Sequence, residues 1–341
     1  NLMCLDNSYV RSGDIDVDQL FKIEDITTKV EAVLPHVPAA VNGLLKIVAG
    51  SDPDVPIGRH CEAPYTCDLK ELCWSFLPEH NPTELYRANK VKIFELIKQG
   101  TVDTVAVAAD TLNEKQLIQQ QALKKKKPHV DRNGIKNWLN RLKYPLYCLD
   151  FETINPAVPL FDGTRPYQHV PFQFSLHVVA RPGAAPKRFE YLAGEPVDPR
   201  PGLIEGLRAT GPKGTVLAYN VTFERRVLNE LANSFPDKRS FLQGIVSRLD
   251  DLIVSFRSFN YYHPDQRGSC SLKDVLPAVT SKSYENLAIH EGKQAAREYH
   301  RVVFGETSAS EKELVLADLR EYCRQDTEAM TDILNALMEL V

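Results

Sequence analysis

Hydrophobic residues recur along the chain with two different spacings. Residues 20–48 carry apolar side chains mostly at helical spacing, and a second helical stripe follows in residues 85–97. Further along, the apolar positions form short continuous runs instead. These runs predict three strands, over residues 144–153, 172–180 and 188–192. The change in spacing indicates a helical first part and a sheet-containing second part.

The remaining pattern completes a mixed architecture. One more strand is expected over residues 215–220. Helices are expected over residues 135–142, 202–209, 222–234, 246–259, 271–279 and 314–340. Three strands followed by a helix, a strand and further helices are typical of a mixed sheet flanked by helices, an α/β fold.

A polar stretch separates the two parts. Three glutamines at 119–121 precede four lysines at 124–127 and Pro128. We interpret this stretch as a linker, which divides the chain into domains at residues 1–128 and 129–341. The lysine run is typical of a solvated helix end, and a phosphate contact is the alternative.

Composition limits the class of protein. Lys and Arg total 41 against 45 Asp and Glu, so the net charge of −4 excludes attachment to nucleic acid by overall charge, but not by a local basic groove. No apolar run approaches the ~20 residues that span a bilayer, and no signal peptide is visible, so we expect a soluble protein without a membrane partner. Seven cysteines in so long a chain favour a reducing, cytoplasmic location. The strand-like start at residues 1–5 suggests a fragment of a longer polypeptide.

Two carboxylates share one face of the strand predicted at 144–153. Asp150 and Glu152 are two residues apart, so both side chains project from the same side, opposite Phe151. Close carboxylates repel each other unless a cation lies between them, and hard oxygen ligands suit Mg²⁺ or Mn²⁺. The alternative is a strand that has reached the surface.

Further acids lie on two predicted helices. Asp326 follows Tyr322 by one helical turn on an apolar face, where a buried carboxylate needs a partner or a metal. Its alternative partner is a neighbouring arginine, Arg320 or Arg324. Glu224 lies in a first helical turn after Asn220, where the helix dipole alone favours an acid.

In order, these motifs resemble the DEDD exonuclease superfamily, in the subclass with a tyrosine in its third motif. The resemblance covers residues 144–341 and implies a ribonuclease H-like fold and a 3′→5′ exonuclease that uses two Mg²⁺ or Mn²⁺ ions. It implies metal ligation by Asp150, Glu152, Glu224 and Asp326, with Tyr322 orienting the attacking water and Asn220 and Asp251 in support. The family has Asp where this chain has Glu224, and the added methylene moves the carboxylate by about 1.5 Å.

Several segments resemble a narrower family still. Residues 144–153, 171–175, 268–273 and 322–327 are similar to the bacterial domain-of-unknown-function family 2779. Members of that family carry this module behind a RecB-type nuclease domain, so the resemblance implies an upstream RecB-like segment of the same polypeptide.

Three cysteines follow one another with five residues between each pair, at Cys61, Cys67 and Cys73. Closely spaced thiolates suit a soft metal centre, and the spacing disfavours a zinc ribbon. The segment resembles the last three ligands of RecB-like iron–sulfur nucleases, which implies a 4Fe-4S cluster whose fourth ligand is Cys4 or an upstream residue. Three free thiols in a packed segment are the alternative.

The sequence thus leads to a metal-dependent nuclease acting on DNA or RNA, at single-stranded 3′ ends, in nucleic-acid processing, repair or defence. The alternative is a catalytically weak ribonuclease H-like module that binds nucleic acid beside an iron–sulfur nuclease; Glu224 favours it. A third possibility is a metal-bound structural scaffold whose acids are surface residues.

Overall fold

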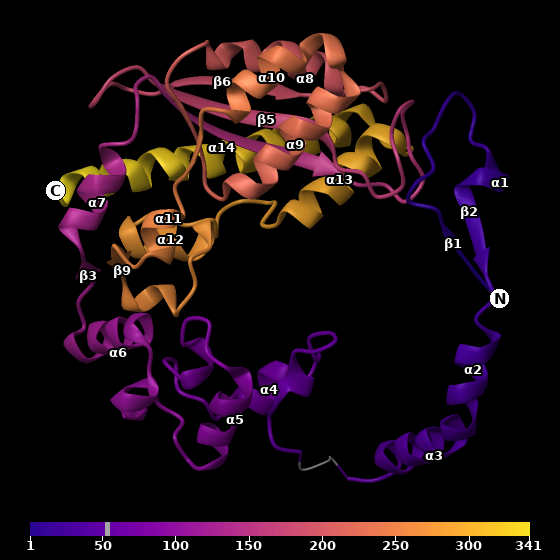
Figure 1. The fold of residues 1–341 in the computed structure, drawn as a ribbon, viewed down its shortest axis with the longest axis vertical. Coiled ribbons are helices and arrows are strands. Elements are labelled where there is room, and N and C mark those ends of the chain that lie inside the picture. The colour runs from indigo at the N-terminus through magenta and orange to yellow at the C-terminus, as the bar shows by residue number, and fades with distance from the viewer. Residues whose placement is uncertain (52–54) are drawn as a thin grey trace. The chain divides into compact units, whose positions relative to one another are not determined.

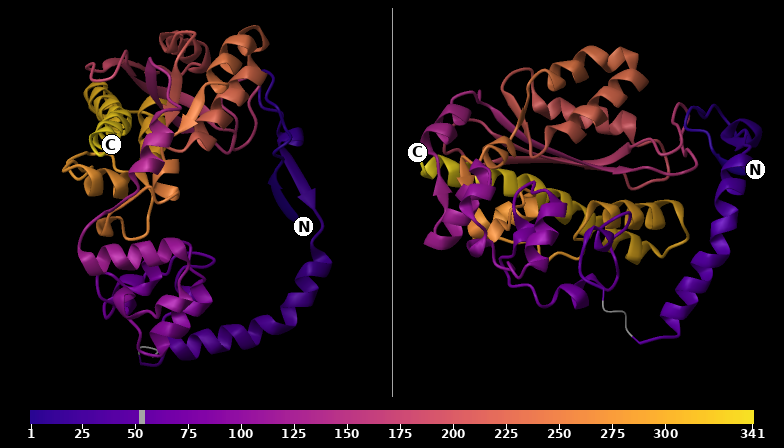
Figure 2. Two further views of the ribbon diagram at one scale, coloured as in Figure 1. Left: turned by 60° about the vertical axis from the view of Figure 1, so that its left-hand side comes forward. Right: turned by 60° about the horizontal axis from the view of Figure 1, so that its bottom comes forward.

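The computed structural model of the protein describes residues 1–51 and 55–341, and it divides into two compact units (Figures 1 and 2). The first unit contains Asn1–Thr83, Ala88–Ala106 and Ala157–Pro166; the second contains Glu84–Arg87, Val107–Pro156 and Tyr167–Val341. This division differs from the boundary expected after residue 128. Within the described residues, no helix is both long and apolar enough to cross a membrane.

The first unit is mostly helical. In this unit β1 (Leu2–Leu5) pairs antiparallel with β2 (Phe21–Glu24), so the helix expected over residues 20–48 is wrong at its start. The unit's helices are α1 (Val17–Leu20), α2 (Thr27–Val33), α3 (Val37–Val48), α4 (Lys70–Trp74) and α5 (Lys90–Lys98). Helix α5 begins where the Asn89 side chain accepts hydrogen bonds from two backbone N–H groups, and it buries Ile93, Phe94 and Ile97.

The stretch expected to be a linker is helix α6 (Glu114–Lys125) of the second unit. Asn113 and Gln116 form a capping box at its start, and Gln116, Gln119 and Gln120 are buried. Their side chains bond to backbone groups of other segments, including a 2.7 Å bond from Gln120 Nε2 to the Val107 carbonyl. The linker prediction failed because buried glutamines satisfied in this way look like solvent-exposed residues in a sequence. The lysines that follow are exposed at the helix end, as expected.

A five-stranded mixed sheet forms the centre of the second unit, in the order β6-β5-β4-β7-β8. Its strands are β4 (Leu146–Ile154), β5 (Val170–Val179), β6 (Lys187–Leu192), β7 (Thr215–Ala218) and β8 (Leu249–Asp251). The first three form the expected antiparallel meander, and β7 and β8 run parallel to β4. The prediction of a mixed α/β sheet flanked by helices is therefore confirmed.

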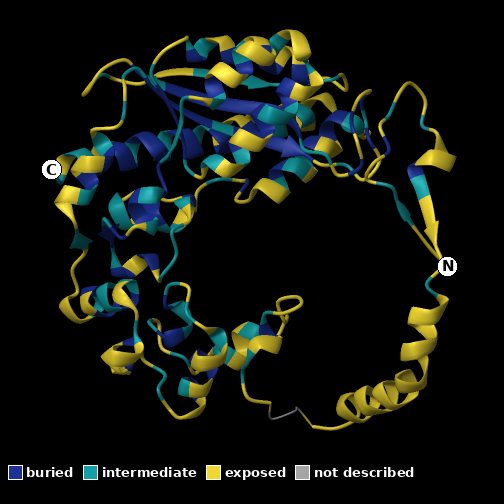
Figure 3. Cartoon of the chain, viewed as in Figure 1, coloured by how far each residue is buried: buried dark blue, intermediate teal, exposed yellow. Residues whose placement is uncertain are grey.

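Helices cover both faces of this sheet, and most of its residues are buried (Figures 2 and 3). On one face, alternate residues of β4 such as Leu149 and Phe151 pack against α8 (Arg200–Gly206), α9 (Val221–Ser234) and α10 (Arg239–Val246). On the other face, Leu146 and Cys148 share a core with α7 (Arg132–Leu139), α12 (Leu272–Val279) and α14 (Ala309–Glu339). Helix α13 (Gly292–Phe304) precedes α14, and β3 (His129–Val130) pairs with β9 (Tyr261–Tyr262) outside the main sheet.

The register between β4 and β5 shifts once, directly after Glu152. Glu152 lies opposite Gln173, whereas Thr153 lies opposite Pro171, so Phe172 has no partner on β4. Such a bulge bends a strand and increases its twist locally.

The helix expected over residues 246–259 is wrong for most of its length. The segment contains the short strand β8 and the one-turn helix α11 (Val254–Arg257). A three-residue strand is too short to show alternation, so pairing with β7 rather than local pattern decides its conformation.

Candidate metal centre

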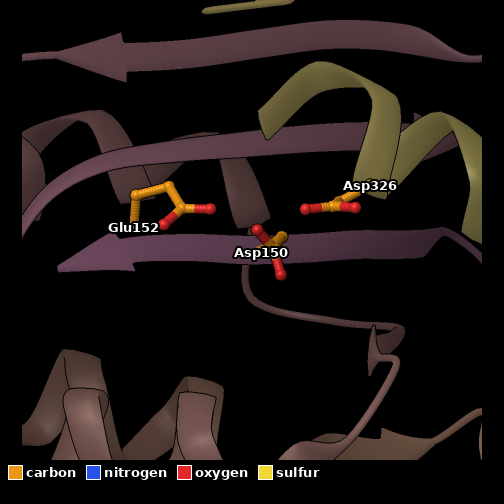
Figure 4. Close-up of side chains that lie close together, drawn as sticks. All are labelled: Asp150, Glu152 and Asp326. Atoms are coloured by element: carbon orange, nitrogen blue, oxygen red, sulfur yellow. The ribbon is translucent and has the colours of Figure 1, made fainter. Parts of the chain in front are cut away.

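Three carboxyl groups meet where β4 passes beneath α14 (Figure 4). Asp150 and Glu152 project from the same face of β4, and Asp326 comes from α14. Each offers an oxygen, and these atoms all lie within 4.8 Å of one another. Glu152 and Asp326 are 7% and 8% exposed, which makes this an interior site rather than a strand end at the surface. Among the described residues, no other group of three or more acids, histidines or cysteines comes as close together.

Helix α14 is fixed against the sheet by hydrogen bonds from β5. The hydroxyl of Thr327, the residue after Asp326, lies 2.7 Å from Ser175 Oγ and 2.8 Å from His177 Nδ1. One helical turn before Cys323, the Leu319 carbonyl accepts a 2.8 Å bond from Gln173 Nε2. These bonds hold Asp326 over β4.

The partner of Asp326 is a tyrosine. The Tyr284 hydroxyl donates a 2.7 Å hydrogen bond to Asp326 Oδ1, and both groups are buried. The arginines considered as its alternative partners bind elsewhere, Arg324 to Glu321 and Arg320 to Glu190. The Cys323 thiol lies 3.7 Å from Asp150 Oδ2 and donates weakly to it.

Burial raises the pKa of all three acids, and repulsion by neighbouring acids adds to this effect for Asp150 and Glu152. Removal from water is the largest cause for each, and it raises the pKa of Glu152 to about 8 and that of Asp326 to about 6. The pKa of Asp150 is raised well above its usual range by burial and by the charges of the neighbouring acids. Without a cation, the site therefore retains protons near neutral pH. A divalent ion would replace those protons, and three carboxylates are the hard oxygen ligands that Mg²⁺ or Mn²⁺ prefers.

Glu224 lies near these acids but outside their group. It is 4% exposed in the first turn of α9, and its Oε2 atom has no hydrogen-bond partner among the residues that the structure describes. Burial and then the charges of Asp251 and Asp326 raise the pKa of Glu224 to about 8, its own backbone N–H acting in the opposite direction. The structure thus brings together three of the four predicted ligands, and leaves the fourth buried with an unsatisfied oxygen.

The two residues predicted to have a supporting role in the site flank the start of α9. Asn220 occupies the N-cap position, but its side chain makes no capping bond. Asp251 accepts hydrogen bonds from the backbone N–H groups of Val221 and Ile253, which ties β8 to the first turn of α9. Asp251 therefore positions the helix that carries Glu224 rather than joining the acid group itself.

Tyr322 lines a cavity of about 400 Å³ above the acids. Its side chain is 4% exposed, and burial and the charge of Asp326 raise the pKa of the phenol, which stays protonated. The cavity is also lined by Asn155, His169, Phe223, Gly292 and Lys293. The three acids line the same cavity, so they and Tyr322 border one space.

Three further residues shape the site and were not predicted for it: Tyr284, Lys273 and Gly292. The Lys273 Nζ atom lies 5.6 Å from the centre of the Tyr322 ring, and its charge lowers the pKa of both Glu152 and Asp326. A Cβ atom at Gly292, at the start of α13, would lie 3.6 Å from Glu152 Oε2, so the backbone passes directly beside that carboxylate. Residues 268–273 had been noted only as part of a family resemblance, and no periodicity marks Tyr284 or Gly292.

The three predicted cluster ligands lie in the first unit. Cys61 is buried, whereas Cys67 and Cys73 are exposed. The Cys67 N–H donates a 3.0 Å bond to the Cys61 carbonyl, but the thiols form no close group of three among the described residues. Cys4, the alternative fourth ligand, is half-buried on β1.

Comparisons with known proteins agree with the narrower of the two resemblances. Residues 147–271 match the family model described as "Domain of unknown function (DUF2779)". The match includes Asp150, Glu152 and Glu224, and ends before Tyr322 and Asp326.

Two curated proteins are similar over a larger part of the chain. The uncharacterized protein MG366 of Mycoplasma genitalium is 27% identical over 229 residues, which cover 61% of this chain and 34% of that protein. The uncharacterized protein UU173 of Ureaplasma parvum is 23% identical over 224 residues, 59% of this chain and 32% of that protein. The similar region thus spans about a third of the length of these relatives. No solved structure shows significant similarity to the chain.

Proposed function

We propose that residues 129–341 are a metal-dependent nuclease that releases nucleotides from the 3′ end of single-stranded DNA or RNA. The observation that carries the proposal is the buried group of Asp150, Glu152 and Asp326, whose oxygens lie within 4.8 Å of one another. Three acids held this close in the interior are costly unless a cation compensates them. A mixed sheet of three antiparallel strands followed by two parallel strands also supports the ribonuclease H-like architecture that the motifs imply.

Different residues of the chain would have different roles in this reaction. Asp150, Glu152 and Asp326 would hold divalent ions, with Glu224 adjacent as a further acid, and the ions would supply charge stabilisation and activation of water. Tyr322 lines the cavity and keeps a protonated hydroxyl, which would orient the attacking water. Tyr284 fixes the Asp326 carboxylate through its 2.7 Å bond, and Lys273 adds a positive charge beside it. Burial keeps bulk water from competing for these groups.

The test is nucleotide release from 5′-labelled single strands of DNA and RNA in MgCl₂ or MnCl₂. Asp150→Asn should abolish release, whereas Asp250→Asn is the matched control, because Asp250 lies on β8 and pairs with Arg141 at the surface. Absence of release from either substrate with either metal would reject the nuclease.

A second candidate is a module that binds nucleic acid without cutting it. The observation that favours it is the position of Glu224, outside the acid group and with one oxygen unpartnered. Tight single-strand binding with no turnover in either metal would select this candidate.

For residues 1–128 we propose the tail of a RecB-like nuclease domain with a 4Fe-4S cluster, on the basis of the Cys61, Cys67 and Cys73 spacing. The thiols form no close group, so the proposal requires that binding of iron orders them. Iron and sulfide analysis of anaerobically purified full-length protein tests it. Cys67→Ser should remove the iron, and Cys148→Ser, at a buried position of β4, is the control.

A further inference from the structure

A second cavity of the second unit, of about 460 Å³, lies at the end of β7. The two residues after β7, Tyr219 and Asn220, line it on one side, and Cys270 to Leu272, at the start of α12, line it on another. Tyr86, Arg87, Ile253 and Arg257 complete the lining. None of these residues belongs to the acid group, so the cavity is a separate feature.

Two arginines line this cavity, and a lysine beside them reaches the backbone of one of the two. Arg87 is exposed and Arg257 half-buried, and the Lys115 Nζ atom donates a 2.5 Å bond to the Arg257 carbonyl. In the described part of the chain, none of the three forms an ion pair. Their charges converge on one point, because each of them lowers the pKa of the Cys270 thiol, which burial raises to about 11. Two acids are also within electrostatic reach, Asp251 of Arg257 and Asp274 of the Cys270 thiol. Three cations against two acids leave a positive charge at this cavity, which attracts an anion.

An aromatic ring is held in place among these cations. The Tyr86 N–H donates to Gln119 Oε1 at 2.9 Å, and the Tyr86 carbonyl accepts from Gln116 Nε2 at 3.0 Å, so buried glutamines of α6 fix its backbone. The ring packs edge-on against Phe259 at 5.0 Å, with the Arg87 guanidinium 5.3 Å from its centre. Arg87 adopts a left-handed backbone with φ +49°, which is uncommon for a residue other than glycine or asparagine. Such a conformation persists only where the surroundings determine it.

We propose that this cavity binds single-stranded nucleic acid, with Arg87, Lys115 and Arg257 at phosphate groups and Tyr86 stacked on a base. Cations that follow a backbone, combined with an aromatic platform, are the two components by which proteins hold single strands. The location is suitable, because Asn220 lines this cavity and Phe223, three residues later in the first turn of α9, lines the cavity above the acids. The inference deepens the proposed nuclease and rests on it, since it places the part of the strand that lies away from the cut.

The experiment measures binding rather than cleavage. Fluorescence anisotropy of labelled dT₂₀ and U₂₀ in EDTA gives a Kd in the absence of divalent metal, at several salt concentrations. The double variant Arg87→Asn/Arg257→Gln should weaken Kd at least tenfold and reduce the slope of log Kd against log salt by about 1.4, or roughly 0.7 for each lost phosphate contact. Asn tolerates the left-handed backbone at 87, and Arg208→Gln, at a surface pair with Glu205, is the control.

A second variant separates stacking from charge. Tyr86→Leu should weaken Kd roughly fivefold to a hundredfold and leave the salt slope unchanged. Tyr65→Leu is its control, because that ring is 83% exposed in the first unit. Wild-type Kd and slope in the double variant, with its circular dichroism unchanged, would overturn the inference.

The outcomes also separate this inference from the proposed nuclease. Binding that depends on Arg87 and Arg257, without nucleotide release in Mg²⁺ or Mn²⁺, would reject the nuclease and support the binding site. Nucleotide release with binding unaffected by either variant would reject the binding site alone. A preference for dT₂₀ over U₂₀, or the reverse, would identify the type of strand.

Discussion

Tyr284 and Asp326 are 42 residues apart in the chain, and the hydroxyl of one donates a 2.7 Å hydrogen bond to the carboxylate of the other inside the protein. The bond lowers the pKa of Asp326, against the burial that raises it. It also fixes the orientation of a carboxylate that faces two other acids. Tyr284, in the loop before α13, thus sets the orientation and lowers the pKa of a carboxyl group on α14.

Replacement of Tyr284 by Phe should therefore weaken the site without disrupting the core. A hydrogen bond to a charged group contributes about 1.5–3 kcal/mol, so the free energy of unfolding at pH 8 should fall by a value in that range. Mn²⁺ affinity, measured by calorimetry, should fall as well. Tyr261→Phe is the control, because its hydroxyl donates to a neutral carbonyl, that of Ala278, at 3.3 Å, and should cost about 0.5–1.5 kcal/mol. Equal losses in the two variants would contradict a charge-assisted bond.

The metal-free protein should lose stability as the pH rises. Glu152 and Asp326 have pKa values of about 8 and about 6 when folded, against ordinary values of 4.5 and 3.8. Over that interval the folded state retains protons that the unfolded state has released, so the free energy of unfolding falls between about pH 5 and about pH 8. Mg²⁺ should restore it at the upper end, because the ion binds the deprotonated acids.

Urea unfolding in EDTA and in MgCl₂, at about pH 5.5 and about pH 8, measures this dependence. Glu152→Gln removes one of the titrating groups, so its loss of stability over the interval should be smaller than that of the wild type. A metal-free wild type that becomes more stable over this interval would show that the acids are not held in the protonated form.

Tyr322→Phe should lower the rate of nucleotide release by roughly 10²–10⁴, the range of a positioned proton-transfer group. The ring stays packed, because only the hydroxyl group of this cavity-lining residue is removed. Thermal unfolding should be unchanged. Tyr299→Phe is the comparison: its hydroxyl is buried without a partner against Phe172, and its loss should leave the rate intact. A rate that is the same in both variants would reassign Tyr322 to packing.

Glu224→Asp tests whether the fourth acid binds a metal. If its carboxylate is a ligand, shortening it by about 1.5 Å changes the distance to the ion and should change the ratio of Mg²⁺ to Mn²⁺ affinity. If Glu224 only complements the start of α9, the ratio and the rate stay as they are. Calorimetric titration of both metals distinguishes the two, with Glu205→Asp at the surface as the control.

Local pattern was sufficient for the part of the site carried by one strand and one helix. Asp150 and Glu152 had to share a face of β4 because they are two residues apart, and Asp326 had to lie on the buried stripe of α14. It was not sufficient for contacts made between distant segments. Lys273 and Tyr284 reach the acids only through the packing of α12 and the loop after it, and neither position has a signal of its own.

The parts of the fold that the sequence pattern did not predict also depend on contacts between distant segments. Residues 249–251 form a strand because they pair with the parallel edge of β7. The glutamines of α6 can be buried because their side chains form hydrogen bonds with backbone groups of other segments. Residue spacing alone also did not show that the Glu224 carboxylate lies outside the group formed by the other three acids.

The bulge after Glu152 leaves β4 in one uninterrupted register with β5 from Leu146 to Glu152, the stretch that carries both acids. This stretch does not tolerate a change of length. Adding one residue to β4 before Asp150 would turn both acids toward α8, α9 and α10 and bring leucine or phenylalanine to the metal-facing side. The connection between β5 and β6, at residues 180–186, is free of that constraint, because its length does not alter the pairing of β4. Length variation among related chains should therefore accumulate in that connection, while β4 keeps one fixed length up to Glu152.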